Sequence, residues 1–419
     1  MTKRENPSSS KTGPRLFYGY VVVVLCFLIL LVSFGLMDSF GVFIKPLLNE
    51  FDWTRATISA TYSLSFLIYG FVGIAIGALT DKFGPRKILT ACGVCLGLGY
   101  LLMSQVKSLW QLYLFEGIII GIGMSALYAP IMSLIARWFI HRRGLMTGIV
   151  LAGLGTGQLV LPPVISRLIS IYDWRLSYFF LGSVVLLVVV TATQFLKRDP
   201  ATIGQLPYGV AVDRKGAAES DDKSYSLKEA ASTIQFWVLV GLKFCYGYYM
   251  FSIVIHIVPH ATDLGISSID AANILALSGL AIIVGSFGLG RLGDKIGPRQ
   301  VFIICFTIAS VSLLFVMEAR ELWMLYLFAV FIGLANGGNV ASDSPLVARL
   351  FGLKWLGSIV GISSCAFSIG AACGPILTGH IFDSTGSYVL AFMICVVFSI
   401  LGIIMASIMR PTGRLQHKL

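Results

Sequence analysis

Long apolar runs, each long enough to cross a lipid bilayer, alternate with short polar segments along almost the whole chain. A membrane-spanning helix needs about 20 predominantly apolar residues, and twelve runs meet this requirement. The pattern therefore predicts an all-α membrane protein with twelve transmembrane helices. The expected helices lie near residues 17–42, 55–80, 87–106, 109–138, 142–170, 175–196, 234–262, 269–293, 300–318, 321–350, 354–380 and 387–408.

The longest polar stretch separates the first six expected helices from the last six. Because it is rich in charged residues, we interpret it as a mobile linker. The expected organisation is an N-terminal tail (1–16), a six-helix bundle (17–196), the linker (197–233), a second six-helix bundle (234–408) and a C-terminal tail (409–419).

Composition and charge support a membrane protein and indicate its orientation. Of 419 residues, 57% are hydrophobic and 12% are charged, whereas soluble domains carry about 25% charged residues. This composition excludes a soluble enzyme and a nucleic-acid-binding domain. Most of the 31 basic residues fall in the two tails, the linker and the loops on the same side of the membrane. Basic residues collect in cytoplasmic loops, so we expect both termini in the cytoplasm and the protein in the inner (cytoplasmic) membrane.

The two halves repeat each other at a nearly constant offset of 213 residues. The segment from Gly77 to Arg86 returns as Gly290 to Arg299, and Leu109-Trp110 returns as Leu322-Trp323. Thr54 and Ser267, both candidate helix N-caps, also correspond. Since each half has an even number of spans, both halves have the same orientation. The sequence thus predicts a parallel repeat about an axis along the membrane normal.

The first copy of the repeated loop has the pattern Gly-x-x-x-Asp-Lys-x-Gly-x-Arg, which resembles the signature of the major facilitator superfamily. Asp81 ends a helix, where a negative charge is unfavourable, so it needs a cationic partner. We interpret the loops as a cytoplasmic charge latch that opens and closes during transport; the alternative is that they only determine topology. The expected gating residues are Gly77, Asp81, Gly84, Arg86, Arg142, Arg143, Asp294 and Arg299.

Further segments resemble bacterial members of the monocarboxylate transporter family, to which oxalate–formate antiporters are related. They include Phe17 to Tyr20, Trp53-Thr54-Arg55, Asp173-Trp174-Arg175 and His256 to Ser267. The resemblance implies a secondary active transporter that moves a small organic acid, such as lactate or pyruvate, by alternating access with proton symport. Open alternatives are an organic-anion exchanger, a porter of a neutral or zwitterionic metabolite, and a membrane sensor without transport.

The chain departs from that family at two positions where its members carry cations. Ser286 occupies the place of an arginine in helix 8, and Asp38 occupies the place of a lysine in helix 1. A carboxylate substrate would therefore lose its usual bidentate partner.

Ionisable residues within spans are costly and are candidates for function. Asp38 is either a proton or cation site or a structural acid. Lys243 either reaches the cytoplasmic interface with its amine or binds an anionic substrate. Glu116 lies either near the lipid headgroups or in the cavity. His256 and Asp263 form a candidate proton relay because histidine titrates near pH 6.5; the alternative is a hydrogen-bonded histidine at the outer rim.

Uncharged polar residues near the middle of the membrane are candidates for substrate contact or for packing, because transporter sites lie near the midplane. With Asp38, Lys243 and Ser286, the candidate substrate site comprises Tyr128, Gln158, Tyr248, Tyr249, Asn336, Asn339, Ser364 and Cys365.

We expect no catalytic residues, metal or cofactor, because the chain has neither a nucleophile–base set nor a phosphate-binding loop. The expected partners are an organic anion, a proton and the lipid bilayer, with no nucleic acid, and we expect a monomer.

Overall fold

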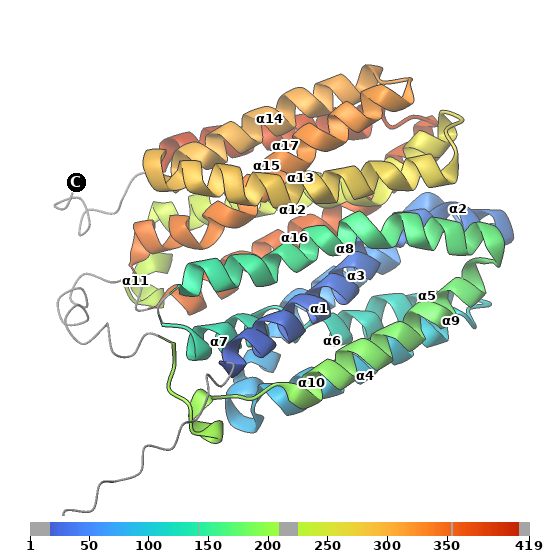
Figure 1. The fold of residues 1–419 in the computed structure, drawn as a ribbon. Helices are drawn as coiled ribbons and strands as arrows, with labels where there is room; N and C mark the ends of the chain where they lie inside the picture. Colours follow the sequence, from blue (N-terminus) through green and yellow to red (C-terminus); the bar gives the residue numbers. More distant parts are fainter. Residues whose placement is uncertain (1–16, 141, 209–224, 353–354, 410–419) are drawn as a thin grey trace, which may run out of the picture.

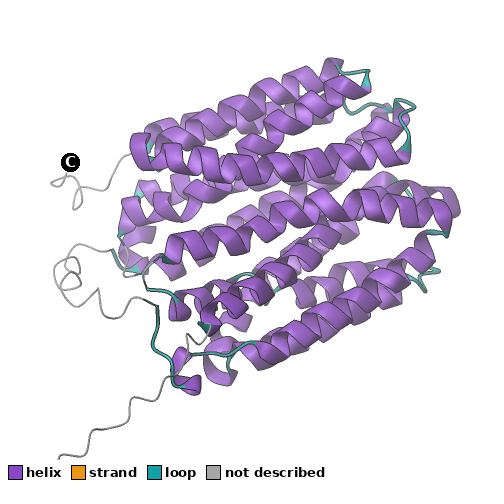
Figure 2. Ribbon diagram, viewed as in Figure 1, coloured by secondary structure: helices purple, strands orange, loops and turns teal. Residues whose placement is uncertain are grey.

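The computed structural model describes residues 17–140, 142–208, 225–352 and 355–409, and long helices dominate these ranges (Figures 1 and 2). The side chains of residues 78, 81, 129, 143 and 356–358 lie outside the description.

The N-terminal half contains six spans, three of which are divided into shorter helical segments. The first span consists of α1 (Tyr18–Asp38) and α2 (Phe40–Glu50), and the next two are α3 (Arg55–Phe83) and α4 (Pro85–Met103). The fourth span consists of α5 (Leu109–Leu112), η1 (Tyr113–Ile120), α6 (Gly121–Met124) and α7 (Ala129–Trp138). The fifth is α8 (Arg143–Ile171), and the sixth consists of α9 (Trp174–Val185), η2 (Leu186–Val190) and α10 (Thr191–Phe195).

The C-terminal half consists of six continuous helices, and the described parts of the expected linker (197–208 and 225–233) contain two short helices. The linker helices are η3 (Pro200–Ile203) and α11 (Leu227–Ala231). The six spans are α12 (Ile234–Asp263), α13 (Ser268–Ile296), α14 (Pro298–Glu318), α15 (Leu322–Phe351), α16 (Leu356–Thr385) and α17 (Val389–Ile408).

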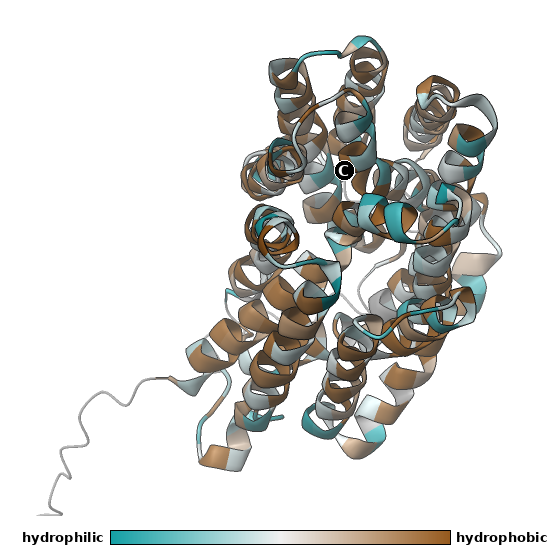
Figure 3. Ribbon diagram, turned by 90° about the vertical axis from the view of Figure 1, so that its right-hand side faces the viewer, coloured by the Kyte–Doolittle hydropathy of each residue, from teal (hydrophilic) through white to brown (hydrophobic). Residues whose placement is uncertain are grey.

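These helices confirm the expected twelve-span architecture. Eleven are long and apolar enough to cross a membrane, and the shorter apolar helix Leu109–Met124 forms the twelfth with α7. This span is interrupted between Met124 and Ala129, just before Pro130, which has no N–H group to donate. Large apolar side chains such as Phe71 and Leu187 are exposed on the outside of the bundle, as Figure 3 shows by the apolar colouring of many outward helix faces. Such a surface suits contact with lipid.

Local chemistry at the repeated positions is the same in both halves. Gly84 and Gly297 have φ angles of 85° and 96°, which glycine adopts without the steric cost of a Cβ atom. A proline follows each of them at the first position of the next helix. The repeat thus builds the same tight turn twice.

The predicted N-caps are formed as well. Thr54 accepts a hydrogen bond from the backbone N–H of Thr57 at 3.2 Å. Ser267 accepts one from the N–H of Asp270 at 3.1 Å. Each bond satisfies a backbone donor that the first turn of a helix leaves free.

The two halves form separate bundles, with the C-terminal half above the N-terminal half in Figure 1. Contacts between the bundles run along α3 and α16 and along α8 and α13. Glycines permit this close approach: a Cβ atom on Gly379 would lie 2.9 Å from the backbone of Ala56, and one on Gly155 would lie 2.8 Å from the carbonyl oxygen of Gly279. Small residues at helix interfaces serve this purpose in membrane proteins.

The halves touch over only part of their length. We call the end that carries the start of α1, the linker and the end of α17 the linker end, and the opposite end the distal end (Figure 1). Near the linker end of four helices, a Cβ atom added to Gly77, Gly148, Gly288 or Gly361 would meet no other atom within 4 Å. At these four positions the helix faces are therefore open, while the distal part is closely packed.

Candidate functional site

A buried ion pair lies inside the C-terminal half. The amine of Lys243 on α12 pairs with the carboxylate of Asp343 on α15. The side chains are 6% and 23% exposed, respectively, so the lysine is desolvated while the acid keeps limited access to solvent. Asp343 was not among the candidates that the sequence indicated. Lys243 pairs within the protein in this state instead of reaching the linker end.

Asparagines and tyrosines lie on the same two helices, within two helical turns of the ion pair. The amide nitrogen of Asn339 donates to the hydroxyl of Tyr249 at 3.0 Å, and the Tyr246 hydroxyl donates to the backbone carbonyl of Asn336 at 3.4 Å. The side-chain carbonyl oxygens of Asn336 and Asn339 have no hydrogen-bond partner. We define the C-half polar cluster as Lys243, Tyr246, Tyr249, Asn336, Asn339 and Asp343.

Unpaired acceptors in this cluster are unusual for a protein interior. Asn336 is 5% exposed and Asn339 is fully buried. Leaving a buried acceptor unsatisfied costs about 1–3 kcal/mol, so most buried polar groups in proteins are paired. A ligand that donates hydrogen bonds would remove this cost. Tyr128, at the interruption of the fourth span, lies within electrostatic range of Asp343, which places the cluster opposite the N-terminal half.

Other residues that the sequence indicated as substrate contacts form hydrogen bonds or ring contacts with other parts of the protein. Gln158 donates to the Ser278 hydroxyl at 2.9 Å and so joins α8 to α13 across the two halves. Ser286 donates to the backbone carbonyl of Gly337 at 3.1 Å. Tyr248 stacks near Phe398, with ring centroids 4.2 Å apart, so it contacts α17 rather than α15.

In the described ranges, the hydrogen bonds of Ser364 and Cys365 run along α16 itself. The carbonyl of Ser364 accepts a hydrogen bond from Ser368, and the Cys365 thiol donates to the carbonyl of Gly361. Neither residue contacts the C-half polar cluster through a hydrogen bond in the described ranges.

At the distal end, Arg55 connects the two halves through several contacts at once. Its guanidinium contacts the carboxylate of Asp263 at 2.8 and 3.0 Å and also donates to the Tyr388 hydroxyl. Asp383 accepts hydrogen bonds from the backbone N–H groups of Arg55 and Ala56 at 3.1 and 2.8 Å. The Arg55 guanidinium also lies 3.9 Å from the centre of the Phe382 ring, a favourable cation–π geometry.

Lys45 adds a second cation to Asp263, at 3.1 Å. We define the distal gate as Lys45 and Arg55 of the N-terminal half with Asp263, Asp383 and Tyr388 of the C-terminal half. The bidentate Arg55–Asp263 pair is the strong form of a carboxylate contact. The sequence included Arg55 in a family-like segment but did not indicate its role, because its partners are more than 200 residues away.

His256 belongs to the edge of this gate and does not contact Asp263 directly. Its Nε2 lies 3.0 Å from the carbonyl oxygen of Pro375 and 3.3 Å from the Ser59 hydroxyl. Its Nδ1 lies 3.3 Å from the Tyr388 hydroxyl. Asp263 instead contacts Lys45 and Arg55. In this state, Tyr388 and Arg55 therefore separate the two members of the expected proton relay.

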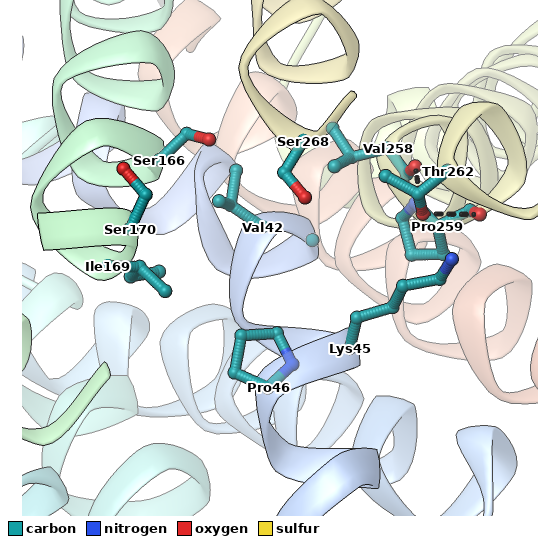
Figure 4. A pocket seen from close by; sticks show the side chains of 11 residues that line it. Val42, Lys45, Pro46, Ser166, Ile169, Ser170, Val258, Pro259, Thr262 and Ser268 are labelled. Atoms are coloured by element: carbon teal, nitrogen blue, oxygen red, sulfur yellow. Dashed lines mark hydrogen bonds between the residues drawn. The ribbon is translucent and has the colours of Figure 1, made fainter. Parts of the chain in front are cut away.

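A small pocket lies beside the distal gate, between α2, α8, α12 and the start of α13 (Figure 4). Lys45 extends from α2 toward Pro259 and Thr262 of α12, while Ser166 and Ser170 face the pocket from α8. The lining includes no member of the C-half polar cluster. We interpret the pocket as a crevice at the closed distal end.

At the linker end, the repeated arginines bind within their own halves. Arg86 donates to the side chain of Gln194 on α10 at 2.8 Å. Arg299 donates to the backbone carbonyls of Ala406, at 3.0 Å, and Ser407, on the last turn of α17. A cation is favourable there because carbonyl groups at a helix C-terminus carry partial negative charge.

The remaining expected gating residues do not form an acid–arginine pair in the described part of the chain. Asp294 is exposed and has no ion pair among the described residues. Arg142 adopts the left-handed conformation with φ of 60° just before α8. The side chains of Asp81 and Arg143 lie outside the described residues, so the latch remains a hypothesis.

Asp38 and Glu116 are both buried in the N-terminal half, with exposures of 7% and 2%. For Glu116 the sequence left open a place near the lipid headgroups or in the cavity, and its side chain is buried within its own half.

Comparison with known proteins agrees with this architecture. The family model of the Major Facilitator Superfamily matches residues 25–242 and 237–418. The chain is 26% identical to rat monocarboxylate transporter 13 over 401 residues, covering 92% of this chain and 87% of the relative. It is also 26% identical to the uncharacterized MFS-type transporter YcxA of Bacillus subtilis strain 168 over 400 residues, covering 93% of this chain and 94% of the relative.

A solved structure has the same fold. The crystal structure of a bacterial homologue of the human lysosomal transporter Spinster, in an inward-facing and occupied conformation, aligns with a TM-score of 0.73. It is 17% identical in sequence, and the alignment covers 94% of this chain and 96% of that structure. With twelve spans in two repeated halves and a family model that matches nearly its whole length, the chain belongs to the Major Facilitator Superfamily, a family of transporters and not of enzymes.

Proposed function

We propose that the protein is a proton symporter of small monocarboxylates and that it prefers 2-hydroxy acids such as lactate. The observation that carries this proposal is the C-half polar cluster, in which two helices hold both a buried ammonium group and unpaired hydrogen-bond acceptors. The curated relatives named monocarboxylate transporters support an organic-acid substrate.

In the proposed complex, the substrate carboxylate takes the place of Asp343 as the partner of Lys243. The substrate hydroxyl then donates its one hydrogen bond to the side-chain oxygen of Asn336 or of Asn339. Pyruvate has a carboxylate but no hydroxyl donor, so it leaves these acceptors unpaired. A site built to pair with a hydroxyl rejects an analogue that lacks it because its own polar groups then stay unsatisfied.

Alternating access is the proposed transport mechanism, with the linker end in the cytoplasm. The excess of basic residues in the tails, the linker and the loops on that side supports this orientation. The similarity to a bacterial transporter supports a location in the cell membrane. The halves pack closely at the distal end, whereas four glycines near the linker end have free space beside them, which supports an opening on that side. A substrate in the central cluster would then be reached from the cytoplasm in this state. We propose that the monomer is the functional unit.

Uptake of labelled lactate into proteoliposomes tests the function. We expect accumulation when an inward proton gradient is present, and only equilibration when it is absent. Pyruvate should compete more weakly than lactate by about tenfold, which corresponds to one net hydrogen bond of about 1.4 kcal/mol. Liposomes without protein provide the background. If protein-containing vesicles take up no more lactate than this background under a gradient, the proposed function is wrong.

A glycine at the interface tests alternating access. In Gly379→Ala the added methyl would lie 2.9 Å from the backbone of Ala56 in the other half, so the distal end must loosen. Overpacking of this kind costs about 1–3 kcal/mol, and we expect a lower population of the distal-closed state and slower uptake. The population of the distal-closed state is measured by the distance between two spin labels. The labels are attached at the exposed residues Asp52 and Ser384, one in each half at the distal end.

The matched control for this experiment is Gly361→Ala on the same helix. A methyl group there meets no atom within 4 Å, so the distance distribution at the distal end should match that of the unmodified protein. Identical distributions for both variants would contradict the inferred distal packing.

A further inference from the structure

Two carboxyl groups and three tyrosine hydroxyls lie buried together inside the N-terminal half, on five different helical segments. Each residue is at most 7% exposed. We define the N-half acid cluster as Asp38 (α1), Tyr62 (α3), Tyr100 (α4), Glu116 (η1) and Tyr178 (α9). It is separate from the ion pair of the C-half polar cluster.

Electrostatic and ring contacts connect the members of the cluster. Glu116 lies within electrostatic range of all three tyrosines, and Asp38 lies within range of Tyr62 and Tyr100. The rings of Tyr100 and Tyr178 stack with their centroids 6.2 Å apart. Aromatic rings cover the outside, since Phe40 stacks on Tyr62 at 5.2 Å and Phe43 stacks on Tyr178 at 3.9 Å. The polar atoms therefore share an apolar enclosure.

These polar atoms lack partners. One carboxyl oxygen of Glu116 and the hydroxyls of Tyr62, Tyr100 and Tyr178 have no hydrogen bond. Neither Asp38 nor Glu116 forms an ion pair with any described residue. An ionised group in a protein interior costs several kcal/mol unless it is paired. Two uncompensated carboxylates in one enclosure are therefore much less stable than protonated carboxyl groups.

Tyr246 of the C-half polar cluster also faces the N-half acid cluster. Tyr246 of α12 lies within electrostatic range of both Asp38 and Asp343, and its hydroxyl donates to the backbone of Asn336. The groups that face the two acids are thus Tyr62, Tyr100 and Tyr178 from their own half and Tyr246 from the other half; no cation faces them among the described residues.

The internal repeat provides a second line of argument. At the offset of 213 residues, Asp38 corresponds to Phe251 and Glu116 to Ala329, while Lys243 corresponds to Leu30. The fold of one half can therefore be packed with an apolar residue at each of these three positions, so packing does not require the charged residue found in the other half. Glu116 also lies in the π-helix η1, and π-helical turns inside α-helices occur frequently at functional sites. The N-terminal half has acquired acids where its repeat has none.

We propose that Asp38 and Glu116 form a proton-binding site, and that the proton bound there is the one coupled to substrate movement. This assignment rests on the proposed function for its transport role, but the protonation itself does not. Asp38 is the more exposed of the two acids, at 7% against 2%, and it lies within electrostatic range of Tyr246 of the other half, so we place proton entry at Asp38. Proton coupling is thereby placed in one half and substrate recognition in the other.

Infrared difference spectroscopy of the purified protein tests protonation without any substrate. Spectra are taken between a mildly acidic pH, above the ordinary pKa of exposed carboxyl groups, and an alkaline pH. They should contain bands of carboxyl groups that are still protonated at the lower pH, and Asp38→Asn and Glu116→Gln should each remove intensity from these bands. Glu318→Gln, which changes an exposed acid at the end of α14, is the matched control and should leave these bands unchanged. If neither variant differs from this control, the proton site is wrong whatever the transport results are.

Two transport assays then test coupling. The isosteric variants Asp38→Asn and Glu116→Gln should lose at least tenfold in gradient-driven lactate accumulation but retain lactate counterflow, which needs no net proton movement. Normal accumulation by both variants would overturn the coupling role. Accumulation driven by a sodium gradient in place of a proton gradient would overturn the assignment of the proton as ligand. If the unmodified protein moves no lactate in either assay while the infrared bands behave as expected, the proposed substrate is wrong and the proton site stands.

Conservative tyrosine variants test the cluster even if the acid variants fail to fold, because they keep both acids in place. Tyr100→Phe keeps the ring that stacks on Tyr178 and removes only the hydroxyl. The Tyr100 hydroxyl lies within electrostatic range of Glu116 and Asp38, and replacing it with an apolar ring edge makes the enclosure less polar. Because an apolar environment disfavours the ionised carboxylate, the loss of the hydroxyl should move the titration of the carboxyl bands to higher pH. An unchanged titration midpoint in Tyr62→Phe and Tyr100→Phe would contradict the arrangement proposed for the cluster.

Discussion

Arg55→Gln is expected to open the distal end and to reduce proton-driven lactate uptake by more than tenfold. Arg55 supplies both contacts of the bidentate pair with Asp263 and a further hydrogen bond to Tyr388. Its side chain is only 9% exposed, so glutamine leaves a partly buried acid without its main cation. Breaking a buried pair costs about 3–5 kcal/mol. Since Asp263 is 27% exposed, we expect about 2 kcal/mol, which still shifts a two-state population by more than tenfold.

Two further substitutions separate charge from geometry at this gate. Lys45 contacts the same carboxylate but is 34% exposed, so Lys45→Gln should have a much smaller effect, as exposed ion pairs do. Arg55→Lys retains the charge but loses the planar fork, and its effect should be intermediate. Spin-label distances between residues 52 and 384 measure the distal opening. The gate hypothesis is wrong if Arg55→Gln shows the distances and the uptake rate of the unmodified protein.

Lys243→Gln is expected to abolish saturable lactate binding. The substitution removes the buried cation of the C-half polar cluster and leaves Asp343 unpaired. Asp343→Asn should also impair transport, because it removes the negative partner that holds Lys243 in place before and after substrate binding. Each single variant should lower thermal stability as well, since a lone buried charge is costly. Counterflow half-saturation and thermal unfolding are the two measurements.

The double variant Lys243→Gln with Asp343→Asn separates recognition from stability. It buries no charge at this place, so its thermal stability should recover to near that of the unmodified protein. Lactate binding should remain lost because the carboxylate has no cation to pair with. Lactate affinity equal to that of the unmodified protein in the double variant would show that Lys243 is a structural residue, and the proposed substrate site would have to be abandoned.

Local features of the fold were predictable from the chain alone. The twelve apolar runs correspond to the observed spans, and the N-caps at Thr54 and Ser267 form as expected. A span depends on its own run of apolar residues, because backbone groups in lipid must be satisfied within the helix. Caps and turns likewise depend on neighbours within about four residues. The repeat then determines that two such bundles are built alike.

The partners of the polar residues were not predictable in this way. The sequence indicated Lys243 but not Asp343, and it included Arg55 in a family-like segment without its contacts to Asp263 and Tyr388. It paired His256 with Asp263 by proximity in sequence, whereas the tertiary structure places Tyr388 and Arg55 between them.

The amino-acid sequence by itself thus determined the spans, their repeat and the types of polar residue buried within them. Only the tertiary structure decided which of these residues meet. The reason is physical: an apolar run specifies that a helix forms and is buried, but the rotation and close approach of neighbouring helices depend on packing at contacts such as Gly379 against Ala56 and Gly155 against Gly279. The burial of Glu116 and the pairing of Lys243 likewise depend on how the helices within each half pack together, and they cannot be obtained from one helix at a time.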